Sequence, residues 1–297
     1  MTRNDFLRIV EIRTKIVSVS SFLIGTVFAA VSGAGFSWSL ALVMFAAVLC
    51  VDMGTTGFNS YYDFVNGVDR PDTDIEGDKI LLRGDTRPAA ALAISGGFFL
   101  AAAGLGLVIG LMAGWQIIVV GTVCMAAGFF YSGGPYPLSR TPFGELLAGG
   151  FLGWVLIALS FVVQTGRLTP AAVWLGLPST ALIASILTVN NTCDLVGDRR
   201  AGRYTLSIAL GARRSEWVIY GLGALAYGLA FALIGSGILT LPAVIPLALA
   251  ALVSASEYRR MHGRGFSPAT KAASMASISK VFVAFTAALL IALSISA

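Results

Sequence analysis

Histidine, cysteine and charge are all scarce in this chain. Its 297 residues include one histidine and three scattered cysteines, and 12% of them are charged. Zinc sites and disulfide frameworks need clustered histidines or paired cysteines, so neither is predicted. Low charge, 57% hydrophobic residues and a mean hydropathy of +0.84 exclude an ordinary soluble domain. The composition instead predicts an all-α integral membrane protein.

Apolar runs of membrane-spanning length follow one another along the chain. About 20 apolar residues cross the hydrocarbon as a helix, and we predict nine such helices in a single transmembrane domain, residues 1–297. The predicted helices cover residues 16–35, 38–58, 89–112, 115–133, 143–164, 170–190, 216–236, 239–255 and 274–296.

The basic residues predict the orientation of these helices. Lys and Arg accumulate in cytoplasmic loops. If the N-terminus is cytoplasmic, 19 of the 20 basic residues lie on the inner side, the exception being Arg167. We therefore predict a cytoplasmic-membrane protein with its N-terminus inside, its C-terminus outside and its active site open to the cytoplasm. The net charge of +5 follows from this orientation, so no nucleic-acid partner is predicted.

Two polar segments at the ends of apolar helices resemble each other. "FNSYYDFVNGVD" and "VNNTCDLVGD" each contain an Asn, an Asp four residues later and then a second Asp. Asp63 and Asp194 are 131 residues apart, which corresponds to four predicted helices. This spacing predicts a parallel 4+4 repeat followed by a ninth helix, so that both acidic ends face one side of the membrane. The two halves would cover about 16–133 and 143–255.

Helical spacing places the polar groups of each segment together. In a continuous helix, Asn190, Asp194 and Asp198 share one face, as do Asn59 and Asp63. Each segment would therefore present its oxygen atoms in one direction.

The turn after the first segment extends this arrangement. The pair Asn66-Gly67 is typical of a left-handed helix end. We expect the chain to turn back there and to bring Asp69 close to Asp63.

Clustered carboxylate and amide oxygens without His or Cys are ligands for a hard cation such as Mg²⁺. Two facing acidic clusters could hold metal ions that clamp a diphosphate. Nearby basic side chains could add direct phosphate contacts. These are Lys79, Arg83, Arg199, Arg200 and Arg203.

An apolar cavity with such a polar end suits a prenyl diphosphate, whose tail can lie between the helices. Ionisation of its C–O bond leaves an allylic cation, which aromatic faces can stabilise. Four tyrosines lie near the inner helix ends: Tyr61, Tyr62, Tyr131 and Tyr136.

Other charged residues have less defined roles. Asp52 lies inside an apolar helix and either faces the cavity or pairs with a polar neighbour; Lys280 is expected to extend to the interface. His262 stands in a basic segment and is expected to be solvated, with no catalytic role. Four further acidic residues belong either to a loop over the substrates or to a solvated surface: Asp72, Asp74, Glu76 and Asp78.

Three stretches carry a family resemblance: "NSYYDFVNGVD", "YSGGPYPLSRTPFGELLAGGFLGWV" and "NNTCDLVGDRRAGRYTLSIALGAR". A weaker fourth is "IRTK" before the first helix. The chain resembles the UbiA superfamily of intramembrane prenyltransferases, and within it the 1,4-dihydroxy-2-naphthoate polyprenyltransferase branch. This resemblance implies a UbiA-type fold of nine helices, Mg²⁺ as cofactor, and transfer of a prenyl group from a prenyl diphosphate to an aromatic acceptor.

The resemblance also assigns roles to individual residues. Metal ligands are expected at Asp63, Asp69, Asp194 and Asp198, and catalytic roles at Asp63, Asp194 and Tyr131. Substrate-binding residues are expected at Asn59, Asn190, Lys79, Arg203 and Lys15. Tyr62 is added to them because it is one of the tyrosines near the inner helix ends.

Two stretches depart from the branch. It usually reads Asn-Asp-Tyr where this chain has Asn59-Ser60-Tyr61, and "GDKILLRGDTRP" replaces its Gly-Pro-x-Arg-like loop. A UbiA-type terpene cyclase, which shares the metal motifs and could convert geranylgeranyl diphosphate to a cyclic terpene, therefore stays open as an alternative. A membrane transporter is less favoured because many transporters have inverted repeats.

Overall fold

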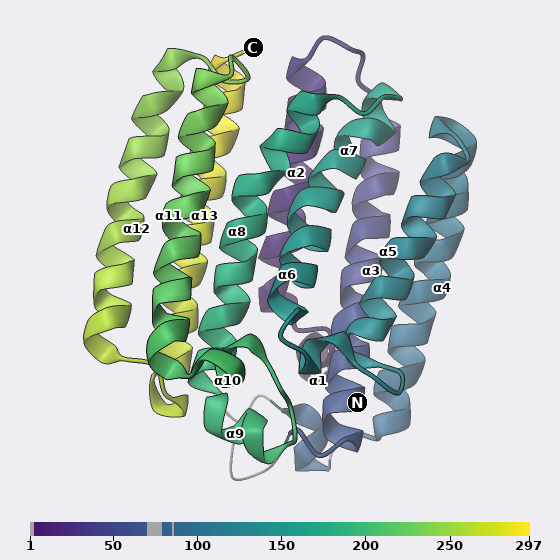
Figure 1. Cartoon of the computed structure of the whole chain (residues 1–297). Helices are drawn as coiled ribbons and strands as arrows, with labels where there is room; N and C mark the ends of the chain where they lie inside the picture. Colours follow the sequence, from purple (N-terminus) through teal and green to yellow (C-terminus); the bar gives the residue numbers. More distant parts are fainter. Residues whose placement is uncertain (1–2, 70–78, 85) are drawn as a thin grey trace.

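The computed structural model describes residues 3–69, 79–84 and 86–297, and within these ranges every regular element is a helix (Figure 1). The first half contains α1 (Arg3–Ile9), η1 (Ile12–Lys15), α2 (Ile16–Val31), α3 (Trp38–Val65), η2 (Ile80–Arg83), α4 (Pro88–Ala113), α5 (Gln116–Ser132) and η3 (Leu138–Arg140). The second half contains α6 (Gly144–Gly149), the π-helical η4 (Gly150–Val155), α7 (Leu156–Thr165), α8 (Pro170–Cys193), α9 (Leu195–Arg200), α10 (Leu206–Leu210), α11 (Ala212–Gly235), η5 (Leu241–Ala243), α12 (Val244–Arg264), η6 (Pro268–Thr270) and α13 (Lys271–Ile295).

Each predicted apolar range overlaps a helix or a continuous run of helices, with some ends displaced by several residues. Seven are long and apolar enough to span a membrane, namely Trp38–Val65, Pro88–Ala113, Gly144–Thr165, Pro170–Cys193, Ala212–Gly235, Leu241–Arg264 and Pro268–Ile295. Two shorter apolar helices, α2 and α5, account for the other two predicted ranges. The prediction of an all-helical membrane protein is confirmed.

The helices form a bundle around α8, while α1, α9 and α10 lie at the end opposite the C-terminus (Figure 1). In the 18-residue apolar stretch of each helix, 67% of α8 is buried but only 17% of α4. A helix that is apolar on all sides can be buried by neighbours, whereas a peripheral one faces lipid. The largest buried cluster joins α8 to α11, α12 and α13 and includes Leu182, Phe282 and Phe285.

The backbones of the α6–η4 run and of α8 are in direct contact. A Cβ atom at Gly149 would lie 2.6 Å from the carbonyl oxygen of Thr180, and one at Gly153 would lie 2.7 Å from the Thr180 Cα. From the other side, a Cβ at Gly176 would lie 2.9 Å from the Trp154 Cα. Glycines at such positions allow helices to approach closely in membranes.

The prediction of one continuous helix through Asn190, Asp194 and Asp198 was wrong at its middle residue. Helix α8 ends at Cys193, Asp194 has φ −92° and ψ 6°, and α9 starts at Leu195. The amide of Asp194 still donates to the Asn190 carbonyl at 3.1 Å, and that of Asp198 to the Asp194 carbonyl at 2.9 Å. The break is therefore a local bend that keeps the hydrogen-bond ladder.

Candidate functional site

One cavity of about 1700 Å³ runs into the bundle between α2, α3, α5, α8 and α13, and we call it the central cavity. Both acid-bearing helix ends open into it. Ten of the residues with predicted roles line it: Asn59, Asp63, Asp69, Lys79, Tyr131, Asn190, Asp194, Asp198, Arg200 and Arg203. The remainder of the wall is largely apolar.

The first helix end, Asn59–Asp69, closes with the turn predicted from Asn66-Gly67. Gly67 has φ +66°. The amide of Val68 donates to the Asp63 carbonyl at 2.8 Å, and the amide of Gly67 donates to the Phe64 carbonyl at 3.1 Å. These two bonds are those of a Schellman motif. The Asp69 amide also donates to the Asp63 carbonyl, at 3.1 Å, so the turn brings the two acids together.

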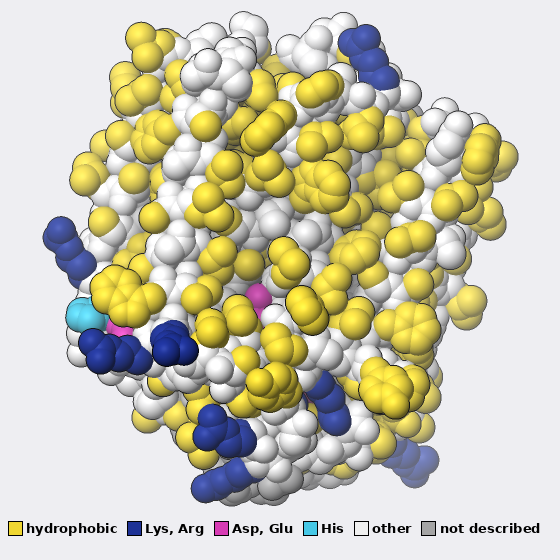
Figure 2. All heavy atoms as spheres, in the orientation of Figure 1, with side chains coloured by type: hydrophobic (Ala, Val, Ile, Leu, Met, Phe, Trp, Pro, Cys, Tyr) yellow, Lys and Arg dark blue, Asp and Glu magenta, His cyan; other side chains and the backbone are white. Residues whose placement is uncertain are grey.

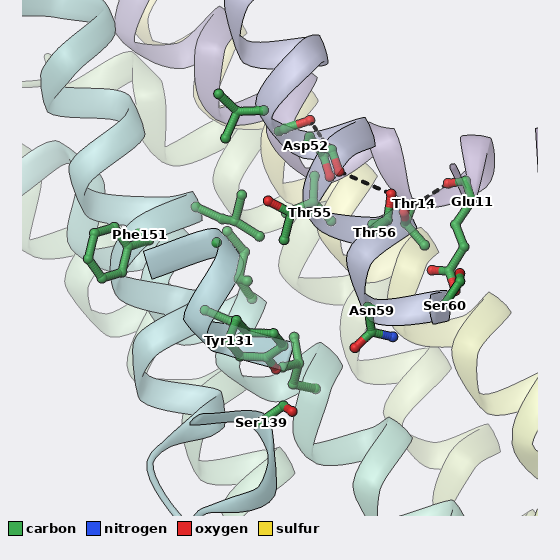
Figure 3. Close-up of a pocket in the computed structure, with 18 of the residues that line it drawn as sticks. Glu11, Thr14, Asp52, Thr55, Thr56, Asn59, Ser60, Tyr131, Ser139 and Phe151 are labelled. Carbon is green, nitrogen blue, oxygen red and sulfur yellow. Dashed lines mark hydrogen bonds between the residues drawn. The ribbon is translucent and has the colours of Figure 1, made fainter. Parts of the chain in front are cut away.

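A short polar network orients Asp63. The Asn59 Nδ2 donates to Asp63 Oδ2 at 3.0 Å, and Ser132 Oγ on α5 donates to Asn59 Oδ1 at 2.7 Å. Figure 3 shows the Asn59 amide of α3 and the Tyr131 ring of α5 facing the same cavity. The network links two helices and fixes the direction of the carboxylate.

Asp69 is paired with a cation. Lys79 Nζ lies 3.5 Å from Asp69 Oδ1, and the Asp69 side chain is 10% exposed. Burial raises the pKa of the Asp69 carboxyl to about 6, although the charge of Lys79 lowers it. A bound divalent cation would favour the ionised form.

The second helix end, Asn190–Arg203, has a cation that the sequence analysis missed. Lys271, the first residue of α13, places its Nζ 2.6 Å from Asp194 Oδ2. By sequence, Lys271 contributed only to the predicted orientation of the helices. The available signal was its position at the start of an apolar helix on the same side as both acidic motifs.

Arg203 pairs with Asp198 at the same end. Its guanidinium donates to Asp198 Oδ1 and to the Ser139 carbonyl, each at 3.0 Å. A second Schellman motif places it there: Gly202 has φ +72°, and the Arg203 amide donates to the Asp198 carbonyl at 3.0 Å. Burial raises the pKa of the Asp198 carboxyl to about 6, and the charge of Arg203 opposes this rise.

The donor set of the cavity fits Mg²⁺. In the described ranges no three His, Cys, Asp or Glu side chains form a group that could hold a metal alone. Mg²⁺ usually binds one or two carboxylates and completes its shell with water and phosphate oxygens. Asp198 Oδ2 is buried without a hydrogen-bond partner in the described structure, so it has free lone pairs. Carboxylates at two helix ends can therefore share metal ions with a diphosphate.

Tyr62 and Lys15 do not contact the cavity, since neither is among the described residues that line it. The Tyr62 ring packs edge-on against Tyr61 at 5.1 Å and Phe129 at 6.0 Å. Lys15 is 4% exposed, and its Nζ lies 2.5 Å from Asp52 Oδ1. Direct substrate contacts by these two residues do not fit their positions.

The other charged residues are placed as follows. Asp52 both lines the cavity and pairs with Lys15 and Ser18, so both interpretations of it hold. Lys280 is 63% exposed and lies 3.9 Å from Glu257. His262 is exposed but bonded to Glu216 at 2.7 Å. The predicted loop acids lie outside the described residues: Asp72, Asp74, Glu76 and Asp78.

Glu11 is a cavity residue that no local sequence signal indicated. It lies between α1 and η1 and lines the cavity next to Ser60 (Figure 3). Its φ of 46° is the sole positive value for a non-glycine residue in the described ranges. The preceding carbonyls are fixed to α3, because Thr56 Oγ1 donates to Val10 at 2.9 Å and Ser60 Oγ donates to Ile9 at 3.3 Å. Ser60 thus anchors the N-terminal segment.

Solved structures show which fold this is. A UbiA homolog from Archaeoglobus fulgidus, bound to DMAPP and Mg²⁺, superposes with a TM-score of 0.67 at 15% identity, covering 98% of this chain and 99% of that one. The apo UbiA homolog from Aeropyrum pernix K1 gives 0.68 at 18% identity, with 94% and 96% covered. At these identities the likeness establishes the all-helical UbiA-like fold.

Sequence comparison gives closer relatives. The 1,4-dihydroxy-2-naphthoate octaprenyltransferase of Bacillus subtilis is 33% identical over 188 residues, which are 63% of this chain and 60% of the relative. The enzyme of the same name from Mycobacterium tuberculosis is 30% identical over 200 residues, 66% of each. The match to the Bacillus enzyme thus spans less than two thirds of that enzyme's length. A model of the UbiA prenyltransferase family matches residues 18–286, and the chain therefore belongs to that family.

Proposed function

We propose that the protein transfers a prenyl group from a prenyl diphosphate to a dihydroxynaphthoate-like aromatic acceptor, with Mg²⁺ as cofactor. One observation carries the proposal. Asp63, Asp69, Asp194 and Asp198 from two distant segments line a single, mainly apolar cavity. The names of the Bacillus and Mycobacterium relatives support the class of acceptor.

Different cavity residues would have different roles in the cleavage of the C–O bond. Mg²⁺ would be held by the four aspartates and would neutralise charge on the leaving diphosphate. Lys79, Arg203 and Lys271 pair with these carboxylates in the described structure. With the carboxylates holding Mg²⁺, these cations would be in a position to bind phosphate oxygens. The C–O electron pair leaves with the diphosphate, and the Tyr131 ring faces the remaining allylic cation.

Polar groups deep in the cavity favour an acceptor over cyclisation. Asp52, Thr55, Thr56 and Glu11 line one side of it along α3 and the N-terminal segment (Figure 3). A terpene cyclase needs a contoured apolar surface that folds a hydrocarbon chain. A polar wall instead suits an aromatic ring that carries hydroxyl groups.

The topology is also part of the proposal. Nine crossings, with the N-terminus cytoplasmic and the central cavity open to the cytoplasm, agree with the basic residues and with the two chain ends at opposite ends of the bundle (Figure 1). The parallel 4+4 repeat within the single domain is supported by α3 and α8, whose acid-bearing ends open into one cavity.

The test separates transfer from cyclisation. Purified protein is incubated with Mg²⁺ and geranylgeranyl diphosphate, with and without 1,4-dihydroxy-2-naphthoate, and the products are identified by mass. We expect a prenylated naphthalene adduct only when the acceptor is present. A cyclic hydrocarbon or terpene alcohol formed without it would establish the cyclase alternative. An unchanged diphosphate under both conditions would contradict both, and bound but intact ligand would favour a transporter.

A further inference from the structure

A second hollow of about 490 Å³ lies on the surface of the bundle, between α11 and α12. It shares no lining residue with the central cavity. Helix α11 begins at Ala212 and α12 ends at Arg264, so the hollow lies at the same end of the bundle as the acidic helix ends. Its lining residues are Arg213, Glu216, Trp217, Tyr220, Tyr258, Arg259 and His262.

The charges of this hollow favour an anion. The carboxylate of Glu216 is engaged, because Tyr220 Oη donates to its Oε1 at 2.9 Å and His262 Nδ1 lies 2.7 Å from the same oxygen. Arg213 and Arg259 are both exposed, and within the described residues neither guanidinium makes a hydrogen bond or ion pair. Two guanidinium groups on neighbouring helix ends can together donate hydrogen bonds to a phosphate group.

Aromatic rings give the hollow a fixed shape. Tyr220 stands at its centre, edge-on to Trp217 at 6.4 Å, to Tyr258 at 5.6 Å and to His262 at 6.3 Å. Trp217 is 69% exposed. Exposed Trp and Tyr near the end of a spanning helix are typical of the level of lipid headgroups. Figure 2 shows the single histidine (cyan) next to basic side chains and a large hydrophobic group at this edge of the molecule.

An apolar surface continues from the hollow towards the membrane centre. Leu252 lies seven residues before Arg259, on the same face of α12, and is 69% exposed. Leu225 lies eight residues after Trp217 on α11 and is 51% exposed. A ligand whose phosphate met the arginines could place an acyl chain along this surface. An anionic phospholipid has both a phosphate group and acyl chains.

We propose that the hollow between α11 and α12 binds the headgroup of an anionic phospholipid, with Arg213 and Arg259 as its phosphate ligands. The ring of Trp217 then packs against the glycerol region. Such a lipid would hold the ends of α11 and α12 together at the membrane surface, next to the segment that carries Lys271. The site is independent of the chemistry proposed for the central cavity.

The test compares two double variants of equal net charge. Arg213→Ala with Arg259→Ala removes both proposed ligands. Arg214→Ala with Arg260→Ala removes their immediate neighbours, which do not line the hollow. The Arg260 side chain is 62% exposed, but its partner Glu257 is 6% exposed and then keeps only Lys280, at 3.9 Å, so the stability of this control variant has to be measured. Thermal unfolding and gel filtration in detergent check that both variants fold.

Lipid binding is then measured by native mass spectrometry with added phosphatidylglycerol or phosphatidylcholine. We expect wild-type protein and the Arg214/Arg260 variant to prefer phosphatidylglycerol, and the Arg213/Arg259 variant to bind it at least about tenfold more weakly. Equal binding of both lipids by wild-type protein, or equal loss in both variants, would overturn the proposal. Farnesyl diphosphate that displaced phosphatidylglycerol at low concentration would assign the site to a prenyl diphosphate instead.

Discussion

The two acid-bearing helix ends are similar in sequence, but the chain leaves the helix in a different way at each of them. At the first helix end the Schellman motif is built on Asp63, and the chain that follows delivers another acid, Asp69. At the second helix end an extra turn, α9, follows Asp194, and the Schellman motif is built on Asp198. The chain that follows there delivers a base, Arg203.

This difference shows that equal spacing of Asn and Asp does not give equal geometry. By sequence, Asp63 corresponds to Asp194, whereas by its place in the helix-ending turn it corresponds to Asp198. The cations also come from different places: Lys79 follows the first helix end in the chain, while Lys271 comes from α13. The site is therefore asymmetric, with the acid-delivering turn on one side and the base-delivering turn on the other.

The largest expected effect tests whether both ends are needed at all. Asp63→Ala and Asp194→Ala should each reduce diphosphate release from geranylgeranyl diphosphate by at least about 100-fold, because each removes a charged oxygen from a metal-diphosphate site. Membrane insertion and thermal unfolding should be unchanged. Near-wild-type turnover in both variants would refute the metal-clamp mechanism, and loss in one alone would show that a single end carries the reaction.

Substitution of the two lysines tests whether the cations at the two helix ends have the same role. Lys79→Met and Lys271→Met should each raise the KM for the prenyl diphosphate by about tenfold, because each would remove a charge-assisted phosphate contact. Lys271 holds its carboxylate at 2.6 Å and Lys79 at 3.5 Å, so Lys271→Met alone should also lower the Mg²⁺ concentration needed for half-maximal rate. Mg²⁺ titrations at fixed substrate measure this. Unaltered KM values in both variants would exclude phosphate contacts.

The asparagines probe a finer difference between the two ends. Asn59 is held by Ser132 and orients Asp63, whereas Asn190 makes a long 3.5 Å contact with Asn191. We expect Asn59→Ala to lower kcat/KM by about tenfold through loss of this network, and Asn190→Ala to lower it less. Steady-state kinetics under identical Mg²⁺ decide. The reverse order would mean that Asn190 acts as a direct ligand.

The smallest expected effects concern the two turns. Gly67 and Gly202 have φ values of +66° and +72°, and a Cβ atom at either position would meet no atom within 4 Å. Alanine there therefore costs about 1 kcal/mol of backbone strain alone. We expect each variant to lower the melting temperature by a few degrees. Gly104→Ala in α4, a helical glycine that also faces open space, should leave it unchanged or raise it. An equal decrease in melting temperature for Gly104→Ala would show that positive φ is not the cause of the loss at Gly67 and Gly202.

Local patterns in the sequence predicted much of this molecule. Hydropathy predicted the apolar helices because a membrane span depends on composition over about 20 residues. The turn at Gly67 was predicted because a left-handed helix end is encoded by adjacent residues. The shared location of Asp63 and Asp194 followed from the number of helices between them.

Long-range pairings were not predictable in this way. Lys271 reaches Asp194 across 77 positions, and Lys15 reaches Asp52 across 37, through packing that no local pattern encodes. The bend at Asp194 was missed because the hydrogen-bond ladder passes through it almost intact. Tyr62 was expected to bind substrate because it lies near an inner helix end, but its ring packs edge-on against Phe129 of α5 and does not line the cavity.

The glycine-mediated contact of α6–η4 with α8 has a consequence for how the central cavity can change its shape. Backbone lies against backbone at Gly149, Gly153 and Thr180, so the spacing of these two elements cannot change through side-chain rotamers. The cavity on this side can therefore adapt only through the side chains that line it, such as Phe151, Leu152 and Ile183. If the ligand is the proposed prenyl diphosphate, a tail too long for the cavity would have to continue between other helices into the lipid, which would make the bilayer itself part of the binding site for long chains.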